Sequence, residues 1–261
     1  MSAAAIDQAR ASAFLPRFYA GIAILAFWQI VVRAFAPAYV ATPIGIVLAV
    51  PHVIVDPTFL LGGLITLAAV AEGLVVALAV GTVLGLVIGQ SKIADRALRQ
   101  YINACYTLPM VVVLPLVSLW FGYTSAARLA TIVFAALFSI AVNVADGARS
   151  VPQEYLEVAR SFRSRSWRTL FEIVLPAATP YFLAGLRLAA GRALIGAVVA
   201  EFFTAIPGLG YFILYNSRTF HHNEAFVAVL LLAAFGVGFD VLVNWITRRY
   251  LPWYRRDEPA N

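Results

Sequence analysis

Few residues in this chain of 261 amino acids have side chains that commonly do chemistry. The chain holds one cysteine, three histidines and one lysine, and it has no H-E-x-x-H, C-x-x-C or G-x-S-x-G motif. His221 and His222 are consecutive, so their side chains diverge on a helix or strand, and we predict no metal site there. The lysine, Lys92, lies between Ser91 and Ile93, which excludes the phosphate-binding motif G-x-x-x-x-G-K-[ST]. The sequence predicts a non-enzymatic protein without a cofactor of its own.

Polar groups inside long apolar runs are the other candidates for function. A charge in the hydrocarbon of a membrane is costly, so it faces a cavity or an internal partner. Glu72, Asn143, Arg187 and Glu201 lie in such runs, and we predict that they border a translocation path. Internal pairing is the alternative, and Asp146 is a possible partner of Arg187.

Composition explains why those runs are so long. The chain is 62% hydrophobic and 12% charged, with a mean hydropathy of +0.86, whereas soluble domains have roughly 25% charged residues. The net charge of +6 comes from basic residues clustered between apolar runs. That clustering favours membrane topology over nucleic-acid binding. A single cysteine, Cys105, excludes an intrachain disulfide.

The hydropathy pattern predicts an all-α, polytopic membrane protein with about six transmembrane helices. A leader (1–17) and a tail (251–261) flank a transmembrane domain, 18–250. Fourteen of the 19 basic residues fall in the leader, in two loops and toward the tail, so the positive-inside rule places both termini in the cytoplasm. The predicted spans are 18–36, 62–90, 100–121, 128–147, 177–203 and 225–247.

Two patterns predict how these helices pack. Gly81, Gly85 and Gly89 recur every four residues, and small residues at that spacing let helices approach closely. Pro109 and Pro115 predict a broken or kinked helix in the third span.

The loop 148–176 carries the densest charge in the chain. A possible capping box, Ser150-x-x-Gln153, opens it. Two short stripes with helical spacing follow, surrounded by arginines, and they indicate an amphipathic docking element for a soluble partner. The stripes are Tyr155, Val158, Ala159 and Phe162, and then Trp167, Leu170, Phe171 and Val174.

The stretch EYLEVARSFRSRSWRTLFEIVLP (154–176) resembles the EAA loop of ABC importer permeases, whose pattern is Glu-Ala-Ala, then Gly, then Ile-x-Leu-Pro. LPMVVVLPLVSLWFG (108–122) and AGLRLAAGRALIGAVVAEFF (184–203) resemble the sulfonate, taurine and nitrate branch, and the likeness runs from about Thr42 to Tyr254. Arg163 stands in place of the family glycine, so a left-handed turn there would be strained. The matching residues are Glu157, Val158, Ala159, Ile173, Leu175 and Pro176 in the loop, with Arg187 and Glu201 beyond it.

The resemblance implies a type I ABC importer permease fold in the bacterial inner membrane. It implies a second permease copy, a cytoplasmic ABC ATPase dimer that binds ATP and Mg²⁺, and an extracytoplasmic solute-binding protein. Arg187 and Arg192 suit a small organic anion such as a sulfonate as solute. The residues predicted to couple to the ATPase are Tyr155, Glu157, Val158, Ala159, Arg160, Phe162 and Pro176.

A second hypothesis is an ion-coupled secondary transporter that uses Glu72 and Asp240 as intramembrane acids. Such transporters often show inverted repeats and paired broken helices. No internal repeat is evident here, and the loop 148–176 would then have no task.

Overall fold

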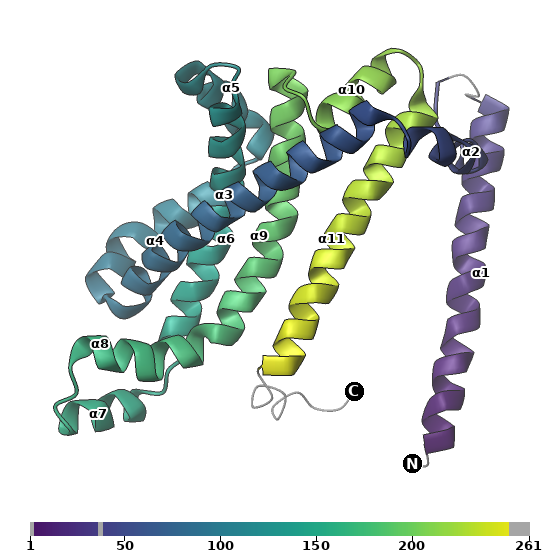
Figure 1. The fold of residues 1–261 in the computed structure, drawn as a ribbon. Helices are drawn as coiled ribbons and strands as arrows, with labels where there is room; N and C mark the ends of the chain where they lie inside the picture. Colours follow the sequence, from purple (N-terminus) through teal and green to yellow (C-terminus); the bar gives the residue numbers. More distant parts are fainter. Residues whose placement is uncertain (1–2, 36–38, 251–261) are drawn as a thin grey trace. The chain divides into compact units, whose positions relative to one another are not determined.

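A computed structural model describes residues 3–35 and 39–250, and no strand occurs among them. The predicted tail, 251–261, lies outside the described residues, whereas the predicted leader is helical from Ala3 onward. The elements are α1 (Ala3–Phe35), α2 (Pro43–Val53), α3 (Pro57–Gln90), α4 (Lys92–Thr107), α5 (Met110–Phe121), α6 (Ser125–Arg149), α7 (Gln153–Ser161), α8 (Ser166–Thr169), the π-helix η1 (Leu170–Val174), α9 (Leu175–Thr204), α10 (Leu209–Arg218) and α11 (His222–Tyr250) (Figure 1).

Five helical stretches are long and apolar enough to cross a membrane, or six if the bent pair α4 and α5 counts as one span. This result confirms the predicted all-α, polytopic fold. The five are Phe18–Phe35, Pro57–Gln90, Ser125–Arg149, Ser166–Thr204 and His222–Arg249.

The described residues fall into two compact units. Among the described residues, the first unit covers 3–35, 39–60 and 212–230, and the second covers 61–211 and 231–250. In the first unit, the rings of Trp28 and Phe226 lie 5.7 Å apart. There the side chain of Asn223 accepts a hydrogen bond from the N–H of Thr42 at 3.1 Å.

Asp56 precedes α3 in the first unit. Its carboxylate accepts hydrogen bonds from the hydroxyl and the N–H of Thr58, at 2.7 and 2.8 Å. Because these bonds favour the ionised form, they hold the pKa of Asp56 below its ordinary value. The carboxylate therefore satisfies one of the N–H groups left without a partner at the start of a helix.

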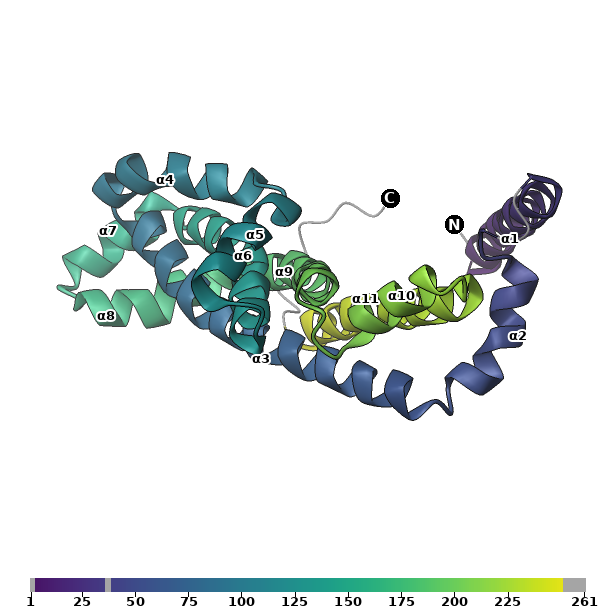
Figure 2. The ribbon, with the colours of Figure 1, turned by 90° about the horizontal axis from the view of Figure 1, so that it is seen from above.

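The second unit is built on three helices, α3, α6 and α9. Figures 1 and 2 show α6 and α9 running side by side. Alanine dominates the buried cluster between the three helices, so their backbones approach closely. The cluster consists of Ala69, Val70, Leu74, Ala77, Ile132, Ala136, Ile140, Val144, Ala189, Ala190, Ala193 and Ala197.

The glycines of α3 lie against α6, as their spacing predicts. A Cβ on Gly81 would lie 2.8 Å from the carbonyl oxygen of Leu137, and one on Gly85 would lie 2.7 Å from that of Ala141. A Cβ on Gly89 would meet Ala148 at 2.5 Å. The close approach of α3 and α6 therefore requires glycine at all three positions.

The predicted break in the third span is confirmed. Helices α4 and α5 meet at an angle of 102°. Leu108 is extended, with ψ of 128°, because the ring of Pro109 disfavours the helical conformation in the residue before it. Pro115 lies inside α5 and does not end it.

We predict that Gly85→Ala lowers the melting temperature of the purified protein, because overpacking a tight contact costs about 1–3 kcal/mol. Gly238→Ala is the matched control, since nothing lies within 4 Å of a Cβ there. It should leave the melting temperature unchanged or raise it, because alanine is the better helix former. Thermal unfolding of both variants in detergent tests the difference, and equal shifts would contradict the packing described above.

Candidate functional site

The predicted docking helix is α7, and it begins later than a capping box would place it. Ser150 ends α6, and its hydroxyl donates to the carbonyl of Gly147 at 2.8 Å. Pro152 is the N-cap residue of α7 and makes no side-chain capping bond. The predicted Ser150–Gln153 capping box is therefore wrong, because the serine hydroxyl serves the preceding helix.

One side of α7 is packed and the other is open. Ala159 is buried, and Leu156 packs against a small apolar cluster that includes Val151 and Val174. Tyr155, Val158 and Phe162 are 60%, 55% and 83% exposed, and Glu157 and Arg160 are exposed as well. Figure 1 shows α7 and α8 at one end of α6 and α9, away from α5. The predicted stripe is thus split, with Ala159 turned inward and three large apolar residues left uncovered.

Arg163 occupies the turn that ends α7, and its φ is +50°. The N–H of Arg163 donates to the carbonyl of Arg160, and the N–H of Ser164 donates to that of Ala159, both at 2.9 Å. This pair of bonds is a Schellman motif, in which glycine is the usual residue at the left-handed position. The turn is therefore left-handed at the position of the family glycine, and the arginine there adopts the strained conformation that the sequence analysis gave as the consequence of such a turn.

The second stripe leads directly into a membrane helix. The N–H of Leu175 donates to the carbonyl of Leu170, which closes a π turn over Leu170–Val174. Pro176 follows in the first turn of α9 and has no N–H for the carbonyl four residues earlier. The wider π turn accommodates a residue without an N–H donor at this position. The helix therefore continues unbroken from Ser166 to Thr204, a length of 39 residues.

A group of four charged residues joins α4 to the end of α6, beside α7. Arg99 donates to Asp146 at 2.6 Å, and Arg149 pairs with Asp95. Arg99, Asp95 and Arg149 line a cavity of about 810 Å³, to which Arg160 of α7 also contributes. The predicted pair of Arg187 with Asp146 is therefore wrong, since Arg99 takes that carboxylate.

Arg187 pairs instead with Asp240 of α11, with 2.7 Å between Nε and Oδ1. It also donates to Asn244, which in turn donates to Asp240. The side-chain amide of Asn143 donates a hydrogen bond to the carbonyl of Ser139, one turn earlier in α6. Glu72 is exposed on α3, and within residues 3–35 and 39–250 no ion pair or hydrogen bond of its side chain occurs.

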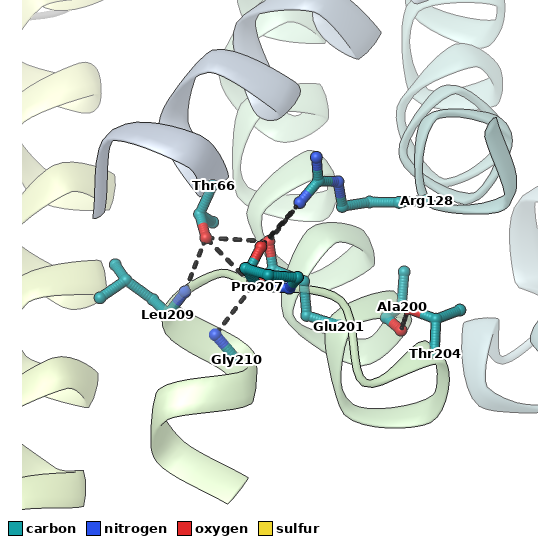
Figure 3. A network of polar contacts seen from close by, with 8 residues as sticks. All are labelled: Thr66, Arg128, Ala200, Glu201, Thr204, Pro207, Leu209 and Gly210. Atoms are coloured by element: carbon teal, nitrogen blue, oxygen red, sulfur yellow. Dashed lines mark hydrogen bonds and ion pairs between the residues drawn. The ribbon is translucent and has the colours of Figure 1, made fainter. Parts of the chain in front are cut away.

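Glu201 is placed differently from the other predicted path residues, because its side chain is fully buried. Its carboxylate accepts from the hydroxyl of Thr66 at 2.9 and 3.0 Å and from the N–H of Gly210 at 2.8 Å. Arg128 of α6 approaches it at 3.3 Å (Figure 3). The structure thus encloses Glu201 among protein groups and does not expose it to a solute.

These contacts connect α3, α6 and α9 to the first residues of α10, all within the second unit. The Thr66 hydroxyl also accepts from the N–H of Leu209 at 2.8 Å, so α3 and α9 together satisfy the first two N–H groups of α10 (Figure 3). A carboxylate at that end is also favoured by the helix dipole. A Cβ on Gly208 would lie 2.2 Å from Cδ of Glu201, so this turn requires glycine. Neither Thr66 nor Arg128 was predicted from the sequence, although an arginine within an apolar run is a signal for a buried charge pair.

We predict that Glu201→Ala lowers the free energy of unfolding by about 3–5 kcal/mol, because it leaves Arg128 buried without its counter-charge. Adding Arg128→Leu to Glu201→Ala should cost less than the sum of the two single variants. Glu72→Ala is the matched control and should leave stability unchanged. Thermal unfolding of the four variants in detergent provides the measurement, and strict additivity would contradict a direct interaction.

Known proteins resemble this chain along most of its length. The sequence model of the family described as "Binding-protein-dependent transport system inner membrane component" matches residues 81–256. The permease protein SsuC of Bacillus subtilis, assigned provisionally to aliphatic sulfonates transport, is 30% identical over 88% of this chain and 84% of its own length. The nitrate import permease protein NrtB of Synechococcus elongatus is 30% identical over 92% of this chain and 90% of its own length.

The fold also resembles a solved structure. A crystal structure of an amino acid ABC transporter with histidines matches with a TM-score of 0.59 and 19% sequence identity, covering 74% of this chain and 94% of that chain. This last likeness concerns the fold, whereas the family match over residues 81–256 and the relatives that are 30% identical establish the family. The chain belongs to the family of binding-protein-dependent transport system inner membrane components, the permeases of ABC importers.

Proposed function

We propose that this chain is the translocation subunit of an ATP-driven importer and that α7 is its contact with a cytoplasmic ABC ATPase. The single observation that carries the proposal is the uncovered face formed by Tyr155, Val158 and Phe162. These residues stand on a helix whose other side is fixed to the protein. Large apolar side chains held rigidly in the open are typical of interaction sites.

The structure offers a route from α7 to the membrane helices. Leu156 attaches α7 to the cluster that contains Val174, and Val174 lies within the continuous helix Ser166–Thr204. A movement imposed on α7 and α8 therefore acts directly on α9. Closure of two ATPases would shift the balance between inward- and outward-facing states only through different affinities for the two.

The remaining parts of the importer follow from family membership. A second copy of this permease would complete the path, an extracytoplasmic solute-binding protein would deliver the solute, and the ATPase dimer would bind ATP and Mg²⁺. In this proposed arrangement, both termini and α7 would lie in the cytoplasm. Relatives named for sulfonates and for nitrate support a small anion as solute, and a small organic anion such as a sulfonate is our proposal.

The alternative of an ion-coupled transporter finds less support. It requires Glu72 and Asp240 as acids able to exchange protons. Asp240 is already engaged within the chain, because it pairs with Arg187 and accepts a hydrogen bond from Asn244. Of these two acids, Glu72 alone lacks a partner among the described residues, and a single acid does not make a relay.

We predict that Tyr155→Ala combined with Phe162→Ala weakens the complex with the partner ABC ATPase by about thirtyfold, since interface aromatic residues often contribute about 2 kcal/mol or more. Co-purification from detergent at graded ATPase concentrations measures the loss of affinity.

Glu157→Lys should abolish solute uptake while the permease still inserts into the membrane.

Tyr39→Ala is the matched control, because Tyr39 is an equally exposed aromatic residue remote in sequence from α7. It should bind the ATPase as the unaltered protein does. If the double variant recovers as much ATPase as the unaltered protein, the docking proposal is wrong. If no ATPase binds the unaltered protein, the secondary-transporter hypothesis becomes the better supported one.

We predict that Arg163→Gly raises the stability of the isolated permease by about 1 kcal/mol, because glycine removes the strain of φ +50°. Arg165→Gly is the control, since Arg165 has an ordinary φ of −65° and should gain nothing. Thermal unfolding compares them. A gain in the isolated permease together with weaker ATPase binding would show that the strained arginine is kept for its partner, whereas no gain would contradict the strain.

A further inference from the structure

We propose that a pocket beside the break between α4 and α5 binds an organic oxyanion, with the guanidinium of Arg192 as its charged group. The proposal rests on the importer function above, because it assigns a solute site within the translocation subunit. It names residues that differ from Glu72, Asn143, Arg187 and Glu201, the path candidates indicated by the sequence.

The pocket has a volume of about 360 Å³ and draws its walls from four helices. Sites for small molecules commonly begin near roughly 300 Å³ and are mostly apolar, with a few polar groups that fix orientation. Arg192 is the only charged residue among those that line this pocket. The lining residues are Cys105, Tyr106, Thr107, Leu108, Met110, Phe134, Ala135, Phe138, Arg192 and Ile195.

The end of α4 holds Arg192 in place without neutralising it. Its Nη1 donates to the carbonyl of Tyr106 at 2.9 Å, and its guanidinium carbon lies 3.9 Å from the centre of the Tyr106 ring. Because the chain turns away at Leu108, the Tyr106 carbonyl lies in the last turn of α4, where carbonyls have no partner within the helix. The helix break therefore supplies the acceptor that orients Arg192.

Arg192 has no carboxylate partner in the part of the chain that the structure describes. Arg187, less than two turns earlier in α9, is paired with Asp240 and Asn244. Both arginines are charged, but the charge of Arg187 is compensated by Asp240. Arg192 therefore remains the one of the two whose charge is uncompensated and whose N–H groups are mostly available to a ligand. A charge in a membrane helix that lacks a counter-ion in its own chain, and that borders a cavity, is a candidate for binding an anion.

The walls indicate what kind of anion fits. A guanidinium presents N–H groups in a plane, which matches the oxygens of a carboxylate or sulfonate. Phe134 and Phe138 lie edge to face with their centres 5.0 Å apart, and Ile195 adds an aliphatic surface. These side chains give an apolar group a place to lie, whereas an inorganic anion such as nitrate would leave them unused. The pocket therefore favours a sulfonate or carboxylate that carries a short apolar chain.

Cys105 makes the proposal testable without new labels, because it lines the pocket and is the only cysteine of the chain. In the purified permease–ATPase complex, we would measure how fast Cys105 reacts with an anionic and with a cationic methanethiosulfonate reagent, by mass spectrometry of the permease. We expect 1-pentanesulfonate to protect Cys105, and we expect Arg192→Gln to weaken that protection by about tenfold in concentration. The variant should also lower the ratio of anionic to cationic labelling rates.

Three further variants keep the test open if Arg192→Gln folds poorly. Arg192→Lys keeps the charge and should retain part of the protection and the labelling ratio. Ile195→Trp narrows the pocket while Arg192 is retained, and it should also weaken the protection of Cys105. Arg33→Gln, which removes an exposed arginine of α1, is the control and should behave as the unaltered protein does.

The outcomes separate the two proposals. Protection that is equal in Arg192→Gln and Arg33→Gln would overturn the anion site, as would equal protection by 1-pentanol. Nitrate protecting as well as 1-pentanesulfonate would overturn the organic part of the assignment. If the ATPase complex forms and hydrolyses ATP but no sulfonate protects Cys105, the site is wrong and the importer function stands. If no ATPase complex forms, the importer function itself fails.

Discussion

A charge withdrawn from water must find a partner, and this requirement organises the second unit. Glu201 is fully buried, and it is stabilised by Arg128, by the Thr66 hydroxyl and by the N–H of Gly210. One carboxylate thereby ties α3, α6 and α9 to the start of α10. The same requirement pairs Arg187 with Asp240. Removing one member of a buried pair costs more than the pair contributes, so the buried pair of Arg128 and Glu201 constrains the helices that carry it.

Apolar residues follow the opposite logic where α7 leaves the protein. Tyr155 and Phe162 remain uncovered, although Leu156 and Ala159 on the same short helix are packed. A helix of nine residues is marginal alone, so its attachment to the protein is what keeps the exposed face in a fixed orientation. Since η1 and α9 continue the chain without a break, that attachment and the membrane helix move together.

Sequence reasoning reached the features that depend on local pattern. Hydropathy predicted the membrane helices, the spacing of Gly85 and its neighbours predicted the approach of α3 to α6, and Pro109 predicted the bend. It failed where the answer depends on which distant groups meet. Arg187 forms an ion pair with Asp240 and not with Asp146, and Arg128 forms one with Glu201. These partners are determined by how the helices pack, which the sequence pattern does not reveal. The Ser150 capping box failed for a local reason, since a hydroxyl can serve either of two adjoining helices.

The two arginines of α9 show how pairing separates structure from function. Arg187 and Arg192 lie in the same apolar helix, and from the sequence both were equally good candidates for binding an anion. Arg187 is neutralised by Asp240, so any anion beside it would compete with an acid already in place. Arg192 rests on a carbonyl and an aromatic ring, neither of which carries a full charge. Its positive charge therefore remains uncompensated beside a cavity, and a mobile anion is the natural counter-charge for it.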